Sequence, residues 1–325
     1  MIDLRALALM NIKHMKKILF ITALLSITIS VLNAQTPVTI NQKSITRHGP
    51  EKGSLLIIGG NIGSTASVWN KFVELAGGKD KAHIVVVTAA GGDSALYDQK
   101  SVDEVKKQTG IKDAVLLHPK SLAEANSDKF VAAIKKATGI YFIGGRQWRI
   151  ADAYLNTLAH QAFLDVLARG GVIAGSSAGA SIQGSFLWRG DTKGAQILIG
   201  DHTQGLGFLK NSAIDQHLLK RNRQFDLVDF IRKAPELIGI GLDEATAIVV
   251  QQDTLEVLGK SYAVIYDYKT IIDEGTIQVS DSKENYTAPA GPLLFLSEGQ
   301  KYDLKNRKSI PATHNNKLKN VPANK

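Results

Sequence analysis

Two adjacent serines, Ser176 and Ser177, lie within the run GGVIAGSSAGAS at positions 170–181. Residues 175–179 read GSSAG and fit the pattern G-x-S-x-G, in which the central serine occupies a sharp turn between a strand and a helix. The flanking glycines let the strand and helix approach closely, and the N–H of Ala178 then points to where an oxyanion would form. The pattern predicts acyl transfer by Ser177; the alternative is a small-residue turn that serves packing alone.

A serine nucleophile also needs a histidine base. Of the eight histidines, His14 belongs to an expected leader and His314 to an expected tail. The others before the serine pair lie near element ends or on a helix face, where solvated histidines are common, which leaves His202 and His217. The segment AIDQHLLKRNRQFDLVDFIRK around His217 reads as a helix, and its alternative role is an exposed, salt-bridged face. It also contains Asp215, Gln216, Arg221 and Arg223.

The base must in turn be oriented, and the segment GIGLDEATAIVV at 239–250 offers two carboxylates. Asp243 and Glu244 lie between two apolar strands, where a buried carboxylate requires partners. One of them would cap a turn while the other faces the histidine. The alternative is a pair of turn carboxylates in solvent.

Short apolar segments alternate with amphipathic ones in the first part of the chain. The strands are expected at 54–60, 83–89, 114–118, 139–145 and 170–175, and the amphipathic segments include 127–138 and 148–170. This alternation predicts a parallel sheet covered by helices on both sides. After Glu236 the short segments 237–242, 246–250, 255–259 and 262–267 predict antiparallel strands that complete the sheet.

Ligands of such sheets gather at the carboxyl ends of the strands. Four features fall there: GGNIGS at 59–64, GGRQ at 144–147, the serine pair, and GLDEAT at 241–246. A nucleotide-binding role for GGNIGS is disfavoured, because its spacing differs from G-x-G-x-x-G and it lacks the P-loop lysine. No HExxH motif or other metal-ligand spacing is present, so neither a metal nor a cofactor is expected.

The net charge of +9 over 325 residues belongs to the two ends of the chain. The first 34 residues carry +3 and the last 25 carry +6, so the body between them is neutral. A neutral body argues against nucleic-acid binding. The absence of cysteine excludes disulfides, thiol catalysis and cysteine-based metal sites.

The amino-terminal segment has the layout of a secretory signal. Two lysines follow Met15, an apolar run covers 18–31, and Ala34 precedes Gln35. A membrane anchor is the alternative, but 14 residues are fewer than the roughly 20 that a spanning helix needs. We therefore expect a leader at 1–34 that is removed on export to the periplasm or medium, one domain at 35–308, and a basic flexible tail at 309–325.

Taken together, GGVIAGSSAGAS, DQHLLKRNR and GIGLDEATAIVV occur in an order and spacing that resemble the cyanophycinase family, serine exopeptidases related to the aspartyl dipeptidases called peptidase E. LLIIGG and YFIGGRQ are also similar, and the resemblance covers about residues 53–303. It implies a flavodoxin-like, three-layer α/β/α fold akin to class I glutamine amidotransferases, with a mostly parallel sheet and antiparallel carboxy-terminal strands. By position it makes Ser177 the nucleophile, His217 the base and Glu244 the orienting acid.

The resemblance further implies substrates and their contacts. These are cyanophycin, a polyaspartate with arginine on each side chain, or other β-aspartyl peptides, released from an end as β-Asp-Arg dipeptides. Oxyanion donors would be the N–H of Ala178 and one from the turn containing Gly60 and Asn61. A homodimer is a family-based expectation. The family's substrate-binding positions fall on Gln147, Asp215, Gln216, Arg221 and Arg223.

Several positions depart from the family pattern. Asn61 and Ile62 stand where an acid is frequent, and Arg146 stands where asparagine is common. Asp226 occupies the place of a third arginine and reverses its charge. Two alternatives therefore stay open: a dipeptidase for other isoaspartyl or N-terminal aspartyl peptides, and an exported binding protein without turnover.

Overall fold

The computed structural model describes residues 47–272 and 293–311. The predicted leader and the part of the predicted tail beyond Pro311 lie outside the described residues. The predicted end of the domain at residue 308 is too early, because Lys308–Ile310 forms the edge strand β14 of the main sheet.

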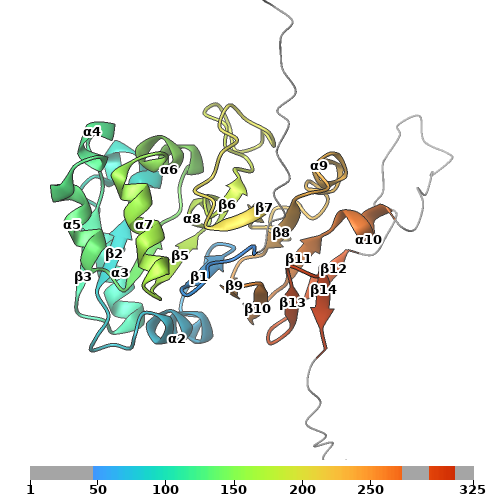
Figure 1. Ribbon diagram of the computed structural model, residues 1–325, viewed down its shortest axis with the longest axis horizontal. Coiled ribbons are helices and arrows are strands. Elements are labelled where there is room, and N and C mark those ends of the chain that lie inside the picture. Colours follow the sequence, from blue (N-terminus) through green and yellow to red (C-terminus); the bar gives the residue numbers. More distant parts are fainter. Residues whose placement is uncertain (1–46, 273–292, 312–325) are drawn as a thin grey trace, which may run out of the picture. The chain divides into compact units, whose positions relative to one another are not determined.

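The main sheet has nine strands in the order β14-β13-β10-β9-β1-β5-β4-β2-β3 (Figure 1). The five strands from β1 to β3 in this order are parallel, and the other four are added antiparallel. The parallel strands are β1 (Ser54–Ile58), β2 (Ile84–Val87), β3 (Ala114–Leu117), β4 (Gly139–Phe142) and β5 (Val172–Ser176). The antiparallel strands are β9 (Thr246–Gln251), β10 (Thr254–Gly259), β13 (Lys301–Asp303) and β14.

The central strands are buried on both faces because helices cover both sides of the sheet. In β1, Leu55 and Ile57 pack into one hydrophobic cluster, whereas Leu56 and Ile58 pack into another on the opposite face. This alternation follows from the two-residue period of a strand. The predicted three-layer, flavodoxin-like α/β/α architecture with a mostly parallel sheet is confirmed.

Helices α2 and α3 contribute to one cluster, and α5, α6 and α7 contribute to the other. The amphipathic segment 148–170 is not continuous but is divided between α6 and α7. Asn156 has a φ of 60°, and the side chain of Thr157 then caps α7 by accepting from the N–H of His160. The helices are α2 (Ala66–Leu75), α3 (Gln99–Thr109), α4 (Leu122–Ala125), α5 (Asp128–Lys136), α6 (Gln147–Tyr154) and α7 (Leu158–Ala168), with short 3₁₀ turns η1 (Ala89–Gly91) and η2 (Asp93–Ala95).

A second sheet has five strands in the order β12-β11-β8-β7-β6. Two segments that were expected to complete the main sheet, β8 and β11, lie in this sheet instead, because β8 pairs in parallel with β7 and β11 pairs with β8. The strands are β6 (Gly184–Phe186), β7 (Leu209–Gln216), β8 (Ile238–Leu242), β11 (Ala263–Tyr266) and β12 (Leu294–Leu296). The remaining helices are α8 (Ala178–Ser181), α9 (Val228–Lys233) and α10 (Tyr268–Ile272).

The helix predicted around His217 is wrong. Residues 209–216 form β7, and only 228–233 of that segment are helical. Pairing of β7 between β6 and β8 overrides the helix-like spacing of charges, since propensity is weaker than tertiary context.

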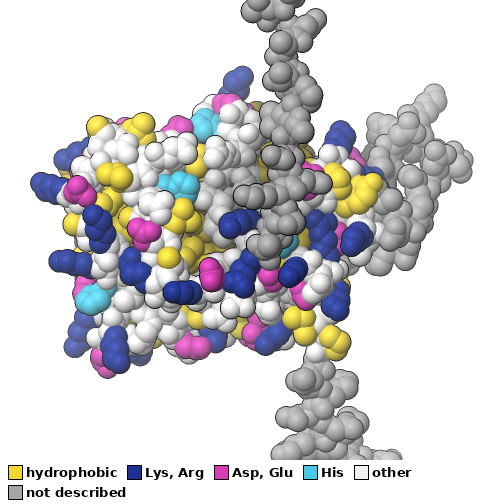
Figure 2. All heavy atoms as spheres, in the orientation of Figure 1, with side chains coloured by type: hydrophobic (Ala, Val, Ile, Leu, Met, Phe, Trp, Pro, Cys, Tyr) yellow, Lys and Arg dark blue, Asp and Glu magenta, His cyan; other side chains and the backbone are white. Residues whose placement is uncertain are grey.

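Basic and acidic side chains are both scattered over the face seen in Figure 2. No helix within the described ranges is long and apolar enough to cross a membrane.

A buried ion pair ties the main sheet to the second sheet. Asp267 follows β11 and is 1% exposed, and its carboxylate accepts from Arg307 Nη1 at 3.0 Å. The same guanidinium donates to the carbonyl oxygens of Pro235 and Glu236, at 3.0 and 2.8 Å. Because Arg307 lies in the turn between β13 and β14, its side chain connects the edge of one sheet to the other.

Replacing Arg307 should therefore destabilise the fold. Arg307→Met leaves the buried Asp267 carboxylate without its cationic partner, and we expect a loss of roughly 2–4 kcal/mol in the free energy of unfolding. Chemical denaturation followed by circular dichroism measures it. Lys305→Met, an exposed position in the same turn, is the control and should change the free energy little. Equal effects of the two substitutions would contradict this role of Arg307.

Candidate active site

Ser177 occupies a strained turn at the carboxyl end of β5. Its φ is 56° and its ψ is −112°, values that a non-glycine residue rarely adopts. The Ser177 N–H donates to the carbonyl oxygen of Ile58 at 3.0 Å, which fixes the turn to the end of β1. A Cβ at Gly175 would lie 2.2 Å from the carbonyl oxygen of Gly179, so this glycine lets strand β5 and helix α8 approach.

The two adjacent hydroxyls have different partners. The Ser176 side chain hydrogen-bonds Tyr141, whose burial raises its pKa well above the ordinary value. The Ser177 Oγ lies 2.9 Å from His217 Nε2. Ser177 is thus the serine that contacts a base, while Ser176 belongs to the packing beneath the turn.

His217 begins the turn after β7 and reaches the end of β1. Its φ is 52°, and its N–H donates to the carbonyl oxygen of Gly59 at 2.8 Å. Its ring lies directly against Gly60, where a Cβ would come within 2.3 Å of Cε1. Gly60 also has a φ of +127°, so both space and backbone conformation favour glycine there.

The two adjacent carboxylates divide their tasks. Glu244 Oε1 lies 2.7 Å from His217 Nδ1, and its Oε2 accepts from the side-chain amide of Asn61 at 3.0 Å. Asp243 instead caps the turn after His217, since its Oδ1 accepts from the N–H groups of Leu219 and Lys220 at 3.0 and 2.9 Å. One acid thus faces the histidine while the other holds the turn in place.

The electrostatics of the site favour a neutral imidazole beside an ionised carboxylate. Burial lowers the pKa of His217, and the nearby cations Arg221 and Arg223 lower it further against the opposing effect of Glu244. The hydrogen bond from Asn61, followed by that with His217, lowers the pKa of Glu244. A neutral imidazole can accept the proton of Ser177 Oγ, as a general base must.

The amino-acid sequence of residues 55–258 matches the model of "Peptidase family S51". The chain belongs to peptidase family S51. It is accordingly a serine-type peptidase.

Curated relatives and a solved structure agree with this assignment. The chain is 27% identical over 284 residues to a cyanophycinase of Nostoc sp., covering 85% of this chain and 94% of the relative. It is 28% identical over 269 residues to a cyanophycinase of Synechococcus elongatus, covering 81% and 83%. The crystal structure of a peptidase from an acI-B1 Actinobacterium shares the fold, with a TM-score of 0.57, 24% identity, and coverage of 79% of this chain and 98% of the other.

The structure brings together Ser177, His217 and Glu244, and the residues expected to supply the oxyanion donors lie next to them. Ala178 directly follows Ser177 as the first residue of α8, so its N–H has no partner within the helix. Gly60 contacts the His217 ring. The side-chain bond of Asn61 to Glu244 was not expected from the sequence. His202, the other candidate base from the sequence, lies elsewhere, with its Nε2 2.8 Å from an Asp152 carboxylate oxygen.

Two of the five expected substrate-binding residues are committed to other partners. Asp215 is completely buried, and its carboxylate accepts from Arg189 Nε and Nη2, both at 2.9 Å, and from Trp188 Nε1 at 3.1 Å. The side-chain amide of Gln147 donates to the carbonyl oxygens of Trp188 and Arg189 at 2.9 and 3.0 Å. Both side chains thus hold the segment between β6 and β7 in position.

The other three expected residues lie around the turn after β7. The buried Arg223 donates from Nη1 to the carbonyl oxygen of Gln216 at 3.0 Å, while its Nη2 is buried without a hydrogen-bond partner among the described residues. Arg221 is exposed. Burial lowers the pKa of Arg223, and the cations Arg189 and Arg221 add to this effect.

Arg189 was missed by sequence reasoning, yet it compensates the charge reversal at position 226. Its guanidinium is 1% exposed and pairs with both Asp215 and Asp226. Burial acts to lower the pKa of Arg189, but these two carboxylates outweigh it and raise the pKa. The only sequence signal for such a pair was the unexpected acid itself.

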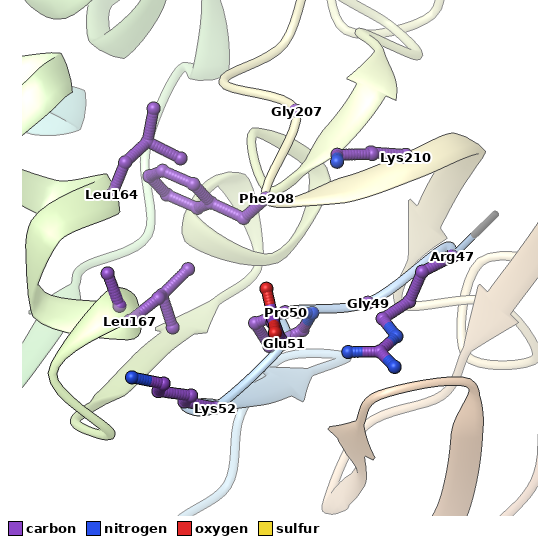
Figure 3. Close-up of a pocket in the computed structure, with 11 residues that line it drawn as sticks. Arg47, Gly49, Pro50, Glu51, Lys52, Leu164, Leu167, Gly207, Phe208 and Lys210 are labelled. Atoms are coloured by element: carbon purple, nitrogen blue, oxygen red, sulfur yellow. The ribbon is translucent and has the colours of Figure 1, made fainter. Parts of the chain in front are cut away.

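A cavity of about 620 Å³ lies at the amino ends of the parallel strands, the end of the sheet opposite to Ser177 (Figure 3). It is lined by Glu51 and Lys52, just before β1, and by Leu167 near the end of α7. The nucleophile, in contrast, follows the carboxyl end of β5. This cavity is therefore separate from the candidate active site. Within 47–272 and 293–311, no three acidic or histidine side chains are grouped as a metal site requires.

Gly60→Ala should remove most of the peptidase activity while leaving the protein folded. The added methyl group would occupy the position of the His217 ring, and a displacement of about 1 Å costs about 100-fold in kcat. Gly63→Ala is the matched control, because Gly63 has a φ of +51° in the same turn but open space around it. Steady-state kinetics measures kcat of both variants, and circular dichroism checks that both are folded. An equal loss of kcat in Gly60→Ala and Gly63→Ala would indicate backbone strain rather than contact with His217.

The pH dependence of kcat/KM should report the depressed pKa of His217. Activity needs the neutral imidazole, so it falls as pH decreases through a midpoint below the ordinary histidine value of about 6.5. Arg221→Gln removes a cation that disfavours the imidazolium, so its midpoint should lie at higher pH than that of the wild type. Lys52→Gln, which lies just before β1 at the amino ends of the parallel strands, should leave the midpoint unchanged. An unchanged midpoint in Arg221→Gln would contradict this electrostatic coupling.

Proposed function

We propose that this S51 peptidase is an exopeptidase that hydrolyses cyanophycin or related β-aspartyl peptides and releases dipeptides such as β-Asp-Arg. The observation that carries the proposal is the unbroken chain of hydrogen bonds from Ser177 Oγ through the His217 imidazole to Glu244, at 2.9 and 2.7 Å. The same residue types in the same geometry perform acyl transfer on unrelated folds. The cyanophycinases among its relatives support the substrate class.

In the acylation step, His217 Nε2 takes the proton of Ser177 Oγ as the oxygen attacks the peptide carbonyl. The oxyanion is stabilised by the N–H of Ala178 and by an N–H from the turn at Gly60 and Asn61. Glu244 stabilises the imidazolium that forms. The tetrahedral intermediate then collapses, the C–N bond breaks, and the imidazolium gives its proton to the leaving amine.

Deacylation repeats these roles with water as the nucleophile. Neutral His217 takes a proton from water, which attacks the ester carbonyl carbon, and the second intermediate collapses with Ser177 Oγ as the leaving group. The imidazolium returns its proton to that oxygen. The two steps consume one water molecule for each amide bond, and the carboxylate of Glu244 remains ionised, as its lowered pKa favours.

The cations beside His217 support an anionic substrate group. Arg221 is exposed, and the buried Arg223 presents Nη2 without a partner among the described residues. Guanidinium groups bind carboxylates through paired hydrogen bonds, and a substrate carboxylate would also offset the cost of burying Arg223. Each unit of a β-aspartyl-arginine polymer carries such a carboxylate.

A second candidate function is hydrolysis of other isoaspartyl or N-terminal aspartyl dipeptides. Asp226 favours it, because this acid stands where the family resemblance implies a third arginine and is held by Arg189, so the site lacks that cation. The triad is the same in both cases, so only the substrate distinguishes them.

Ser177→Ala should abolish hydrolysis and preserve the fold, with a loss in kcat of about 10⁴-fold or more, as when a nucleophile of a triad is removed. Ser176→Ala is the matched control, because its hydroxyl faces Tyr141 rather than His217 and its loss should affect activity much less. A fluorophosphonate probe should label the wild-type protein and Ser176→Ala but not Ser177→Ala. Substantial activity in Ser177→Ala would refute the assignment of the nucleophile.

The substrate assignment is tested with the purified protein, cyanophycin and a panel of β-aspartyl dipeptides, with products read by mass spectrometry. Release of β-Asp-Arg from cyanophycin is the expected result. Cleavage of dipeptides alone would favour the second candidate. A protein that reacts with the probe but cleaves neither class would require a different substrate, and one that does neither would be a binding homologue.

A further inference from the structure

A cavity of about 380 Å³ lies at the carboxyl ends of the parallel strands, the same end of the main sheet as Ser177. Its walls come from the segments that follow the carboxyl ends of β2 and β3 and from the first turns of α6. Asp93 and His118 lie in the first two of these, and Trp148, Arg149 and Asp152 lie on α6. Nothing in the proposed triad or its oxyanion groups uses this cavity.

The cavity is close to the nucleophile along the turn that follows β4. A Cβ at Gly144 would lie 3.3 Å from the Cβ of Ser177. The next residues contact η1, since a Cβ at Gly145 would lie 2.3 Å from the carbonyl oxygen of Ala90 and the Arg146 N–H donates to that oxygen at 2.9 Å. Helix α6 begins at Gln147, one residue further on. Trp148, the first residue of α6 that lines the cavity, thus lies four residues after Gly144 along the chain.

Charged groups of both signs line the cavity without neutralising one another. Among the described residues, neither Asp93 nor Lys120 has an ion-pair partner. The Lys120 ammonium lies 5.9 Å from the centre of the Tyr97 ring. Asp152 is paired with His202 rather than with a cation of the cavity. A cavity lined by an acid and a cation that do not pair with each other suits a ligand that carries both charges.

Arg149 is positioned to bind a carboxylate. Its guanidinium packs 5.2 Å from the centre of the Trp148 ring, and its one hydrogen bond, to the carbonyl oxygen of Ala90, is 3.5 Å long. Most of its N–H groups are thus available. Gly92 makes this placement possible, because a Cβ there would lie 2.8 Å from Arg149 Nη1. Trp148 also lines the cavity, and its buried Nε1 has no hydrogen-bond partner among the described residues.

We infer that this cavity is a subsite for the substrate unit next to the cleaved bond, a zwitterionic side chain that carries a carboxylate and a guanidinium. Arg149 and Lys120 bind the carboxylate, and Asp93 binds the guanidinium. The inference rests on the proposed function, because only a substrate longer than one β-aspartyl dipeptide would extend from Ser177 into this cavity. It goes beyond that function by assigning residues that select the neighbouring unit.

The test compares two synthetic substrates with the same type of scissile bond: two linked β-Asp-Arg units, and one β-Asp-Arg unit linked to alanine. Asp93→Asn and Arg149→Gln should each lower the ratio of kcat/KM for the first substrate to that for the second by about tenfold, the effect of one charged hydrogen bond. Glu51→Gln and Lys52→Gln, in the cavity at the amino ends of the parallel strands, should keep the wild-type ratio. Asp93 is exposed, so Asp93→Asn is expected to fold even if Arg149→Gln does not.

A ratio that stays at the wild-type value in both cavity variants would overturn the subsite. Failure of the proposed function has a different signature, namely that the wild-type protein cleaves neither substrate. In that case titration calorimetry of the Ser177→Ala protein with the two compounds decides. If the subsite exists, Ser177→Ala binds the two-unit compound more tightly than the alanine compound. The double variant Ser177→Ala/Asp93→Asn should bind the two compounds with similar affinity. Equal affinity of Ser177→Ala for both compounds would reject the subsite.

Discussion

The imidazole of His217 can reach both Ser177 and Glu244 only because the backbone at Gly60 has no side chain in its way. A methyl group there would overlap the ring. The same short turn supplies the carbonyl oxygen of Gly59 that accepts from the His217 N–H, and the Asn61 amide that holds Glu244. One turn after β1 thus sets the position of the base, and its neighbours in the sheet bring the nucleophile to it.

A buried network of charges lies beneath the turn that carries His217. Asp215 is fully enclosed, and Arg189 donates to both of its carboxylate oxygens. Arg189 also reaches Asp226, so an acid at that position has a partner in the protein itself. Removal of one member of such a network leaves an uncompensated charge in a site of low dielectric constant. The network therefore constrains the segment that leads from β6 to β7, while Arg221 stays exposed beside His217.

The main sheet and the turn at Ser177 could be predicted from the sequence because their signals are local, whereas the grouping of His217 and Glu244 with Ser177 was expected only from the family resemblance. The apolar runs of β1, β2, β4 and β5 mark a parallel sheet, and the glycines around Ser177 mark a sharp turn. The second sheet could not be predicted in this way. The charged spacing around His217 resembles a helix, and its true conformation depends on pairing with strands that are distant in sequence. The separate tasks of Asp243 and Glu244, adjacent in sequence, are likewise decided by which atoms the fold brings to each side chain.

The division of the triad between two sheets has a consequence for specificity. Ser177 comes from the main sheet, whereas His217 and Glu244 follow β7 and β8 of the second sheet. Backbone hydrogen bonds join the two at the reaction centre, from the His217 N–H to Gly59 and from the Ala245 N–H to Gly60, at 2.8 and 3.0 Å. Backbone bonds do not depend on side-chain identity, so substitutions that leave the space beside the His217 ring open, unlike one at Gly60, can preserve these two bonds. A residue on the segment after β7 can therefore change charge, as at Asp226, without removing these backbone bonds.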